Sequence, residues 1–157
     1  MILVFLEHKD GTVADVSLQA LTLARTYADG APVDAVACVS GTQGGVVPGG
    51  AAVEALHLAE NDVFGSHAPA AVAQSIVELA DRLSPTAVIA AGNEIGNEVM
   101  AHVAAKLNLP LGANCVEATP GDPARVTRVR WGGSLLEEAA LHAPVKLLTV
   151  QPHAVAA

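Results

Sequence analysis

Residues 86–107, TAVIAAGNEIGNEVMAHVAAKL, contain one complete structural unit of the predicted fold. Residues 86–91 are predicted to be a strand, because the apolar run from Ala87 to Ala91 is the pattern of a strand buried on both faces of a sheet. Glu94 to Leu107 has the composition and length of a helix. Gly92-Asn93 forms the turn between them, where Asn93 is placed to cap the helix. A buried strand, a short turn and a helix make up the repeating unit of a parallel sheet.

The same pattern extends to both sides of this unit. We expect strands at 2–6 and 33–39, a helix at 16–28 capped by Asp15 or Ser17, a short helix at 51–59, a short strand at 61–64 and a helix at 69–83. The last third predicts strands at 113–118, 125–131 and 145–150, with a hairpin turn at 120–123 and no long helix between them. The predicted fold class is therefore α/β, a three-layer largely parallel sheet with helices on both faces and antiparallel strands added at the C-terminal end. Residues 1–157 are expected to form a single domain.

Composition and charge exclude several classes of function. The chain has 157 residues, of which 52% are hydrophobic and 3% aromatic, so the core must consist of Ala, Val and Leu. The formal net charge of -8 argues against nucleic acid and anionic membranes as partners. We expect no membrane insertion and no signal peptide, because the apolar start of the chain lacks a basic region before it. Cys38 and Cys115 fit buried thiols in a reducing, cytoplasmic setting.

No motif predicts a catalytic or metal centre. The glycine-rich segment 41–50 lacks both the P-loop signature and the dinucleotide spacing, which favours a plain flexible loop over a phosphate cradle. The segment 92–98 follows a strand. Gly96 in its first helical turn indicates that another group approaches the backbone closely there, and packing within the chain is favoured over a ligand. A surface role is favoured for Glu7 and His8, since neighbouring strand residues point to opposite faces. The other histidines have no metal-ligand spacing, so the sequence offers no convincing catalytic centre.

The densest basic stretch is Arg128-Val129-Arg130-Trp131. Strand alternation places Arg128 and Arg130 on one face, with Val129 and Trp131 on the opposite face. Two interpretations remain open. The stretch is either an edge strand protected by charge or a strand that faces a partner or a flavin, since Arg and Trp are enriched in binding hot spots.

Four segments, in order, resemble the alpha subunit of electron-transfer flavoprotein. They are the opening strand Val4-Phe5-Leu6-Glu7-His8 with the leucine pattern that follows it, the helix segment Val103-Ala104-Ala105-Lys106-Leu107, the strand and turn from Arg128 to Ser134, and the closing strand Lys146-Leu147-Leu148-Thr149-Val150. The resemblance covers essentially the whole chain. It implies an adenine-nucleotide-hydrolase-like fold and the N-terminal domain only, because the chain stops before the family's C-terminal FAD-binding domain would begin.

The resemblance implies a scaffold that docks on a beta-type subunit while FAD carries electrons from dehydrogenases. It thus implies an electron-carrier subunit more than an enzyme. FAD would be held mainly by the domain absent from this sequence, and AMP is possible in the partner subunit. Arg128, Arg130, Trp131 and Gly133 are the candidate flavin- or partner-facing residues. One alternative is a stand-alone adenine-nucleotide-binding module of the universal-stress-protein type, with its pocket at the turns 7–11 and 92–97. The other is a small enzyme of the adenine-nucleotide hydrolase type, which lacks a candidate nucleophile.

Overall fold

The apolar runs of the sequence pair side by side in the computed structural model, which describes residues 1–41 and 53–157. The strands are β1 (Ile2–Phe5), β2 (His8–Lys9), β3 (Thr12–Val13), β4 (Val33–Val39), β5 (Leu56–Glu60), β6 (Ala87–Ala91), β7 (Leu111–Thr119), β8 (Ala124–Arg130), β9 (Leu135–Leu141) and β10 (Lys146–Val150). The main sheet has the order β5-β4-β1-β6-β10-β7-β8-β9, and β2 pairs with β3 in a small separate hairpin.

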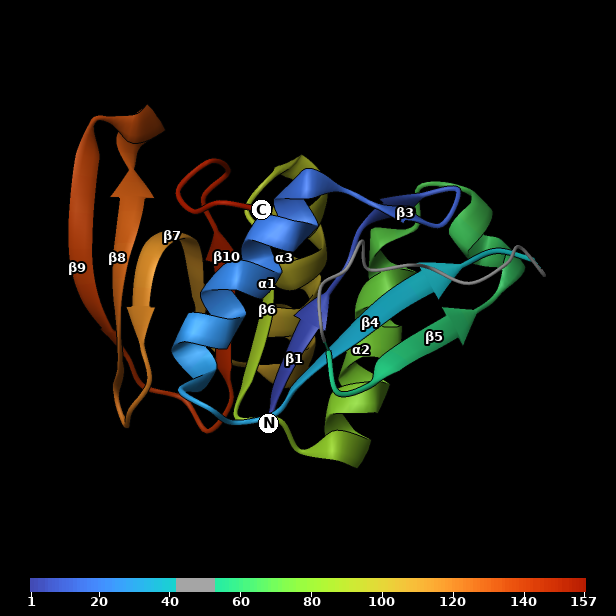
Figure 1. Ribbon diagram of the computed structural model, residues 1–157, viewed down its shortest axis with the longest axis horizontal. Helices are drawn as coiled ribbons and strands as arrows, with labels where there is room; N and C mark the ends of the chain where they lie inside the picture. Colours follow the sequence, from blue (N-terminus) through green and yellow to red (C-terminus); the bar gives the residue numbers. More distant parts are fainter. Residues whose placement is uncertain (42–52) are drawn as a thin grey trace.

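Parallel pairing holds the centre of the sheet together, and antiparallel pairing extends it at one end. β5, β4, β1, β6, β10 and the start of β7 pair in parallel. β8 is antiparallel to β7, and β9 is antiparallel to β8. The register between β7 and β10 shifts at Asn114, which has a left-handed backbone with φ of 58°. Figure 1 shows β7 arching over at this end of the sheet. The predicted α/β sheet with added antiparallel strands is confirmed.

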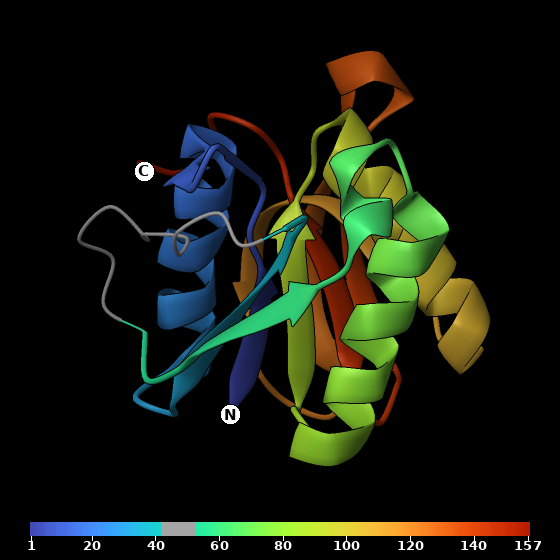
Figure 2. The ribbon, with the colours of Figure 1, turned by 90° about the vertical axis from the view of Figure 1, so that its right-hand side faces the viewer.

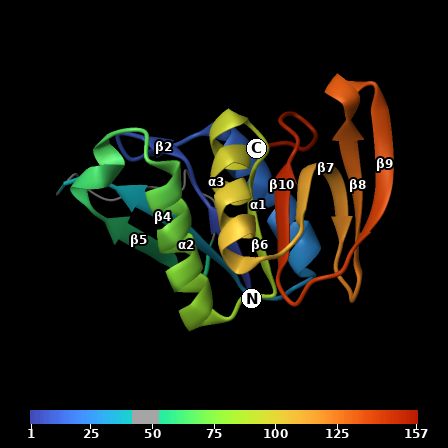
Figure 3. The ribbon, with the colours of Figure 1, turned by 180° about the vertical axis from the view of Figure 1, so that it is seen from behind.

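Helices cover both faces of the sheet, as predicted. They are α1 (Asp15–Ala28), α2 (Pro69–Leu83) and α3 (Glu94–Leu107), with two short 3-10 turns, η1 (Asp62–Gly65) and η2 (Trp131–Gly133). Figure 2 shows the three layers edge-on, with α1 on one side and α2 and α3 on the other. Figure 3 shows α2 and α3 from behind, lying side by side over the parallel strands. Each face therefore has its own apolar core.

The small side chains of the sequence determine how closely these layers pack. Residues 87–91 of β6 are all buried, and three of the five are alanine. A helix can pack close to a sheet only where the facing side chains are short. Pro69 begins α2, where its missing N–H leaves no hydrogen bond unmade. The predicted bounds of α2 and α3 are confirmed.

Several local predictions are wrong. The helix expected at 51–59 is wrong where the structure describes it: residues 53–55 are irregular, and from Leu56 the chain forms the strand β5, which pairs in parallel with β4. The strand expected at 61–64 is the 3-10 turn η1, capped by the side chain of Asn61. Neither Asp15 nor Ser17 caps α1, because the Ser17 hydroxyl accepts a hydrogen bond from the Glu7 N–H instead. The glycine-rich segment falls largely on residues 42–52, outside the described residues.

The edge-strand interpretation of the basic stretch is also wrong, because β9 lies outside β8. β9 itself was not predicted. Among residues 1–41 and 53–157, none of the helices combines the length and the apolar content that spanning a bilayer would require.

Candidate functional site

Polar side chains gather at the carboxyl ends of the central strands. The chain runs outward from β1 through β4 to β5 on one side, and β6 begins the other half. The crevice between such halves is the usual ligand position in open α/β sheets. Here Glu7, which follows β1, accepts a hydrogen bond from the Asn93 amide, which follows β6, with a distance of 2.9 Å between Oε2 and Nδ2. The turns at 7–11 and 92–97 therefore meet, as the nucleotide-binding alternative requires.

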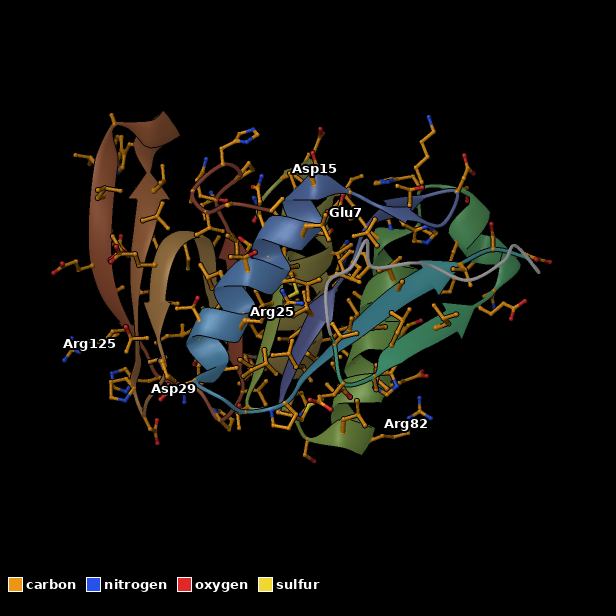
Figure 4. All side chains as sticks on the ribbon, viewed as in Figure 1. Glu7, Asp15, Arg25, Asp29, Arg82 and Arg125 are labelled. Carbon is orange, nitrogen blue, oxygen red and sulfur yellow. The ribbon has the colours of Figure 1, made fainter. Side chains whose placement is uncertain are left out.

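The surface role expected for Glu7 is wrong. Figure 4 places its side chain beside the start of α1, where it is largely covered. Its Oε1 is buried and has no hydrogen-bond partner among the described residues. Burial raises the pKa of this carboxyl group, and the Asn93 hydrogen bond offsets part of that increase. A carboxyl group is a poor neighbour for a phosphate, so the geometry adds no support for a nucleotide at this position.

A hydrogen-bonded cluster of Asn97, Asn114 and Thr149 lies beside this crevice. The Asn97 amide donates to the Gly92 carbonyl at 3.0 Å and to Asn114 Oδ1 at 2.9 Å. The Thr149 hydroxyl donates to Asn97 Oδ1 at 2.6 Å and accepts from the Asn114 N–H at 2.9 Å. This cluster ties α3 to β10 and to the bend in β7. It thereby fixes the position of Asn114 on β7.

The segment from Gly92 to Glu98 has a packing role, as the sequence favoured. The Asn93 side chain accepts from the Gly96 N–H at 2.9 Å, so the predicted helix cap is confirmed. A Cβ at Gly92 would lie 2.6 Å from the Val150 carbonyl oxygen, and a Cβ at Gly96 would overlap the Ala91 carbonyl. The close approach expected at Gly96 is therefore made by the chain itself.

Arg128 and Arg130 of β8 lie on one face of the strand, as predicted. Both contact Glu137 of β9, each with an N–O distance of 3.3 Å. Arg128 also donates from Nε to the Ala113 carbonyl at 2.9 Å, and its side chain is only 18% exposed. Arg130 is more open. Arg128 therefore holds the bend of β7 against β8, and Arg130 presents most of the accessible positive charge.

A groove of about 400 Å³ brings the predicted site residues together. It is lined by Asn114, Arg128, Val129, Arg130, Trp131, Gly132, Gly133 and Gln151. Trp131 is 78% exposed, and it has a left-handed backbone, as Gly132 and Gly133 have after it. Two glycines allow this tight turn because they lack a Cβ. All four sequence candidates, Arg128, Arg130, Trp131 and Gly133, thus line one groove.

The sequence interpretation missed two leucines next to this groove. Leu135 and Leu136, at the start of β9, are 54% and 69% exposed. We call Trp131, Leu135 and Leu136 the hairpin tip. Figure 1 shows it at the outer end of the β8–β9 hairpin, away from the helices. Two adjacent leucines shortly after a Gly-Gly turn were the available signal, because strand alternation points them to opposite faces and one face of a sheet can bury only one of them.

Other reactive side chains are remote or buried. Burial raises the pKa of the Cys38 thiol and of the Cys115 thiol to about 12 in each case, and Arg128 slightly offsets the effect at Cys115. Both cysteines are free. His57 on β5 pairs with Asp34 on β4, with 2.8 Å between Nε2 and Oδ2. This pair lies toward the edge of the sheet opposite the groove. Within residues 1–41 and 53–157, no group of three or more His, Cys, Asp or Glu side chains is arranged to hold a metal ion.

Residues 2–157 match the electron transfer flavoprotein domain. The chain belongs to the electron transfer flavoprotein family. Among its relatives is the electron transfer flavoprotein subunit alpha of Mycobacterium tuberculosis, strains CDC 1551 and H37Rv, which is 28% identical over 158 residues. The corresponding subunit of Mycobacterium leprae is 29% identical over 157 residues. Each alignment covers 99% of this chain and 48% of the relative. The chain thus spans about half the length of the curated relatives it matches, and the resemblance drawn from its motifs is confirmed.

Proposed function

We propose that this chain is the N-terminal part of an alpha-type subunit of an electron transfer flavoprotein. In this proposal residues 1–157 form one domain, which docks on a beta-type subunit in a heterodimer. The complex takes electrons from dehydrogenases through FAD, in the cytoplasm. The observation that carries the proposal is the family match over residues 2–157, together with relatives named as alpha subunits.

The hairpin tip is the surface we assign to docking. Trp131, Leu135 and Leu136 are three exposed apolar side chains at the end of a ribbon that projects beyond the helices. Apolar side chains grouped in this way mark interaction sites more often than scattered ones do. Arg130 lies next to Trp131, and its contact with Glu137 restricts its orientation before binding. An aromatic anchor beside a restrained arginine is typical of interface hot spots.

The groove beside the tip suits part of a flavin dinucleotide and not the whole of it. Arg128 and Arg130 share one carboxylate, that of Glu137, so this cluster keeps one uncompensated positive charge. A volume of about 400 Å³ is at the low end for a small-molecule pocket. Arg128, Arg130, Trp131 and Gly133 would therefore wall an anionic or aromatic portion of FAD held mainly by another domain. When bound, FAD supplies the electron-carrying chemistry, and these residues orient it and exclude water.

The test is to produce the chain with the beta-type subunit and measure complex formation by light scattering and visible absorption. Trp131→Ala is expected to weaken the complex by about 2 kcal/mol or more, the usual scale of a hot spot. Because Trp131 is mostly exposed, its removal should leave the stability of the isolated chain within about 0.5 kcal/mol. Leu58→Ala is the matched control, because Leu58 is exposed on β5 at the opposite end of the sheet.

Arg128→Ala is also predicted to reduce complex formation. Since Arg128 holds the β7 bend, its variant must first be shown to be folded by circular dichroism. Equal affinity of the wild-type chain, Trp131→Ala and Arg128→Ala for the beta-type subunit would refute the assigned surface. If the wild-type chain forms no complex with the beta-type subunit, the proposed function itself is wrong.

A further inference from the structure

A second cavity lies at the amino ends of the strands, opposite the groove of the hairpin tip. Its volume is about 570 Å³, and it lies between the start of β1, the end of α1, the β7–β8 turn and the segment before β10. Figure 1 shows these segments together at the end of the molecule that carries the N-terminus, and Figure 4 shows Asp29 at the same end of α1. None of its lining residues belongs to the groove or to the hairpin tip.

The cavity contains a lysine that is almost completely buried. Lys146 begins β10, and its side chain is only 9% exposed. Burying an ammonium group is costly unless strong partners replace its water. Its Nζ donates to the Ala143 carbonyl and, at 3.3 Å, to the Asp122 carboxylate. The Asp122 side chain is 88% exposed, so solvent screens this ion pair, which stabilises the fold little.

The ammonium group has more hydrogen-bonding capacity than these partners use. A lysine has three N–H donors, and the described residues provide one carbonyl and one solvated carboxylate. Lys146 lines the cavity, so its remaining donor is available to a molecule inside it. An anion placed there would also gain from the reduced screening around a buried charge.

The walls determine what kind of anion would fit. Apart from Lys146, Asp122, Thr86 and Gly121, the lining consists of Ile2, Tyr27, Ala28, Ala31, Pro120, Ala143 and Pro144. Tyr27 is 4% exposed, and its side-chain hydroxyl makes no hydrogen bond within the described residues. Its buried ring presents an apolar surface, and its hydroxyl is free to pair with a ligand. Burial raises the pKa of Tyr27, which keeps that hydroxyl protonated and able to donate.

We infer that this cavity binds a small organic acid, with its carboxylate on Lys146 and an apolar, flat body against Tyr27 and the two prolines. The inference does not depend on the electron-transfer function or on the hairpin tip. A charged group at one end and apolar walls at the other are the usual composition of small-molecule sites. Asp122 competes with the ligand for the same ammonium group. Removing its charge therefore strengthens binding.

The experiment uses benzoate as the probe and benzyl alcohol as its uncharged counterpart, titrated into the full chain. Backbone amide shifts of a ¹⁵N-labelled sample report binding. We expect benzoate to shift the amides of Tyr27, Ala31, Gly121 and Lys146 at roughly millimolar concentration, and benzyl alcohol to bind at least about tenfold more weakly. Asp122→Asn should tighten benzoate binding by about threefold or more.

Lys146→Met should remove the preference for benzoate over benzyl alcohol, and Lys106→Met, at an exposed position of α3, should keep it. If Lys146→Met does not fold, Asp122→Asn and the comparison of the two probes still decide the question. The inference is overturned if benzoate shifts no amide around the cavity. It is overturned equally if both probes give the same shifts, or if Asp122→Asn lowers stability without changing benzoate binding. The last result would mean that Lys146 only holds the β7–β8 turn in place.

Discussion

Thr149→Val tests the hydrogen-bonded cluster that positions the bend of β7. Thr149 is fully buried on β10, and valine has nearly the same shape. The substitution removes two hydrogen bonds and leaves the Asn114 N–H and the Asn97 Oδ1 without their partner. An unpaired buried group costs about 1–3 kcal/mol. Because Asn97 and Asn114 are only half-buried, water replaces part of the loss, and we expect a total decrease of about 2–3 kcal/mol in the free energy of unfolding.

The assay is urea unfolding followed by far-ultraviolet circular dichroism. Fluorescence is unsuitable, because the single tryptophan, Trp131, is already exposed in the folded chain. At roughly 2–4 °C per kcal/mol for a chain of this size, the melting temperature should fall by about 5–10 °C. Thr119→Val is the matched control, since Thr119 is an exposed strand residue, and its effect should stay within about 0.5 kcal/mol.

Equal effects of the two threonine substitutions would refute the reasoning, because they would show that the two hydrogen bonds contribute nothing net. A double-mutant cycle with Asn97→Ala separates the pair from its surroundings. A coupling energy of about 1 kcal/mol between Thr149 and Asn97 is expected for residues in one network.

Three further predictions concern other groups that are buried or closely packed. The raised pKa of Glu7 means that the folded state holds its proton more tightly than the unfolded state, so the free energy of unfolding falls as pH rises above the ordinary pKa of 4.5. In urea unfolding at a series of pH values, Glu7→Gln should flatten this decrease, whereas the substitution Glu60→Gln at an exposed position should leave it unchanged. An unchanged slope in both variants would contradict the assignment to Glu7. Gly96→Ala gains about 1 kcal/mol of helix propensity, but its Cβ would overlap the Ala91 carbonyl. The free energy of unfolding should therefore fall by about 1–2 kcal/mol. A rise in that free energy, measured by urea unfolding, would show that the backbone relaxes there. Both thiols, with pKa values of about 12, should react with iodoacetamide at pH 8 far more slowly in the folded chain than in urea, and equal rates would contradict their burial.

The sequence predicted the elements whose pattern has one physical explanation. Residues 87–91 are apolar throughout, and such a run fits a strand covered on both faces. Residues 69–83 place their apolar residues on one helical face, and proline begins the helix. The candidate residues of the groove were also predictable, because Arg128 to Gly133 are neighbours in sequence and a short turn keeps them together.

β5 and β9 could not be predicted, for a common reason. Their sequences, LHLAE and LLEEAAL, consist mostly of residues that favour helices. Each becomes a strand because a neighbouring strand offers an unpaired edge, β4 in one case and β8 in the other. Strand formation depends on such partners more than on intrinsic preference. The outcome is therefore decided by tertiary structure and not by the local sequence.

The sequence by itself determined the α/β class, the bounds of the long helices, the family and the location of the basic stretch. All of these depend on local pattern or on residues close together in the chain. Only the tertiary structure decided that Glu7 meets Asn93, that Thr149 joins Asn97 to Asn114, and that Lys146 faces a cavity beside Tyr27. The residues brought together lie between 17 positions apart, for Asn97 and Asn114, and 119 positions apart, for Tyr27 and Lys146. Packing of the layers brings them together, and no local pattern encodes that packing.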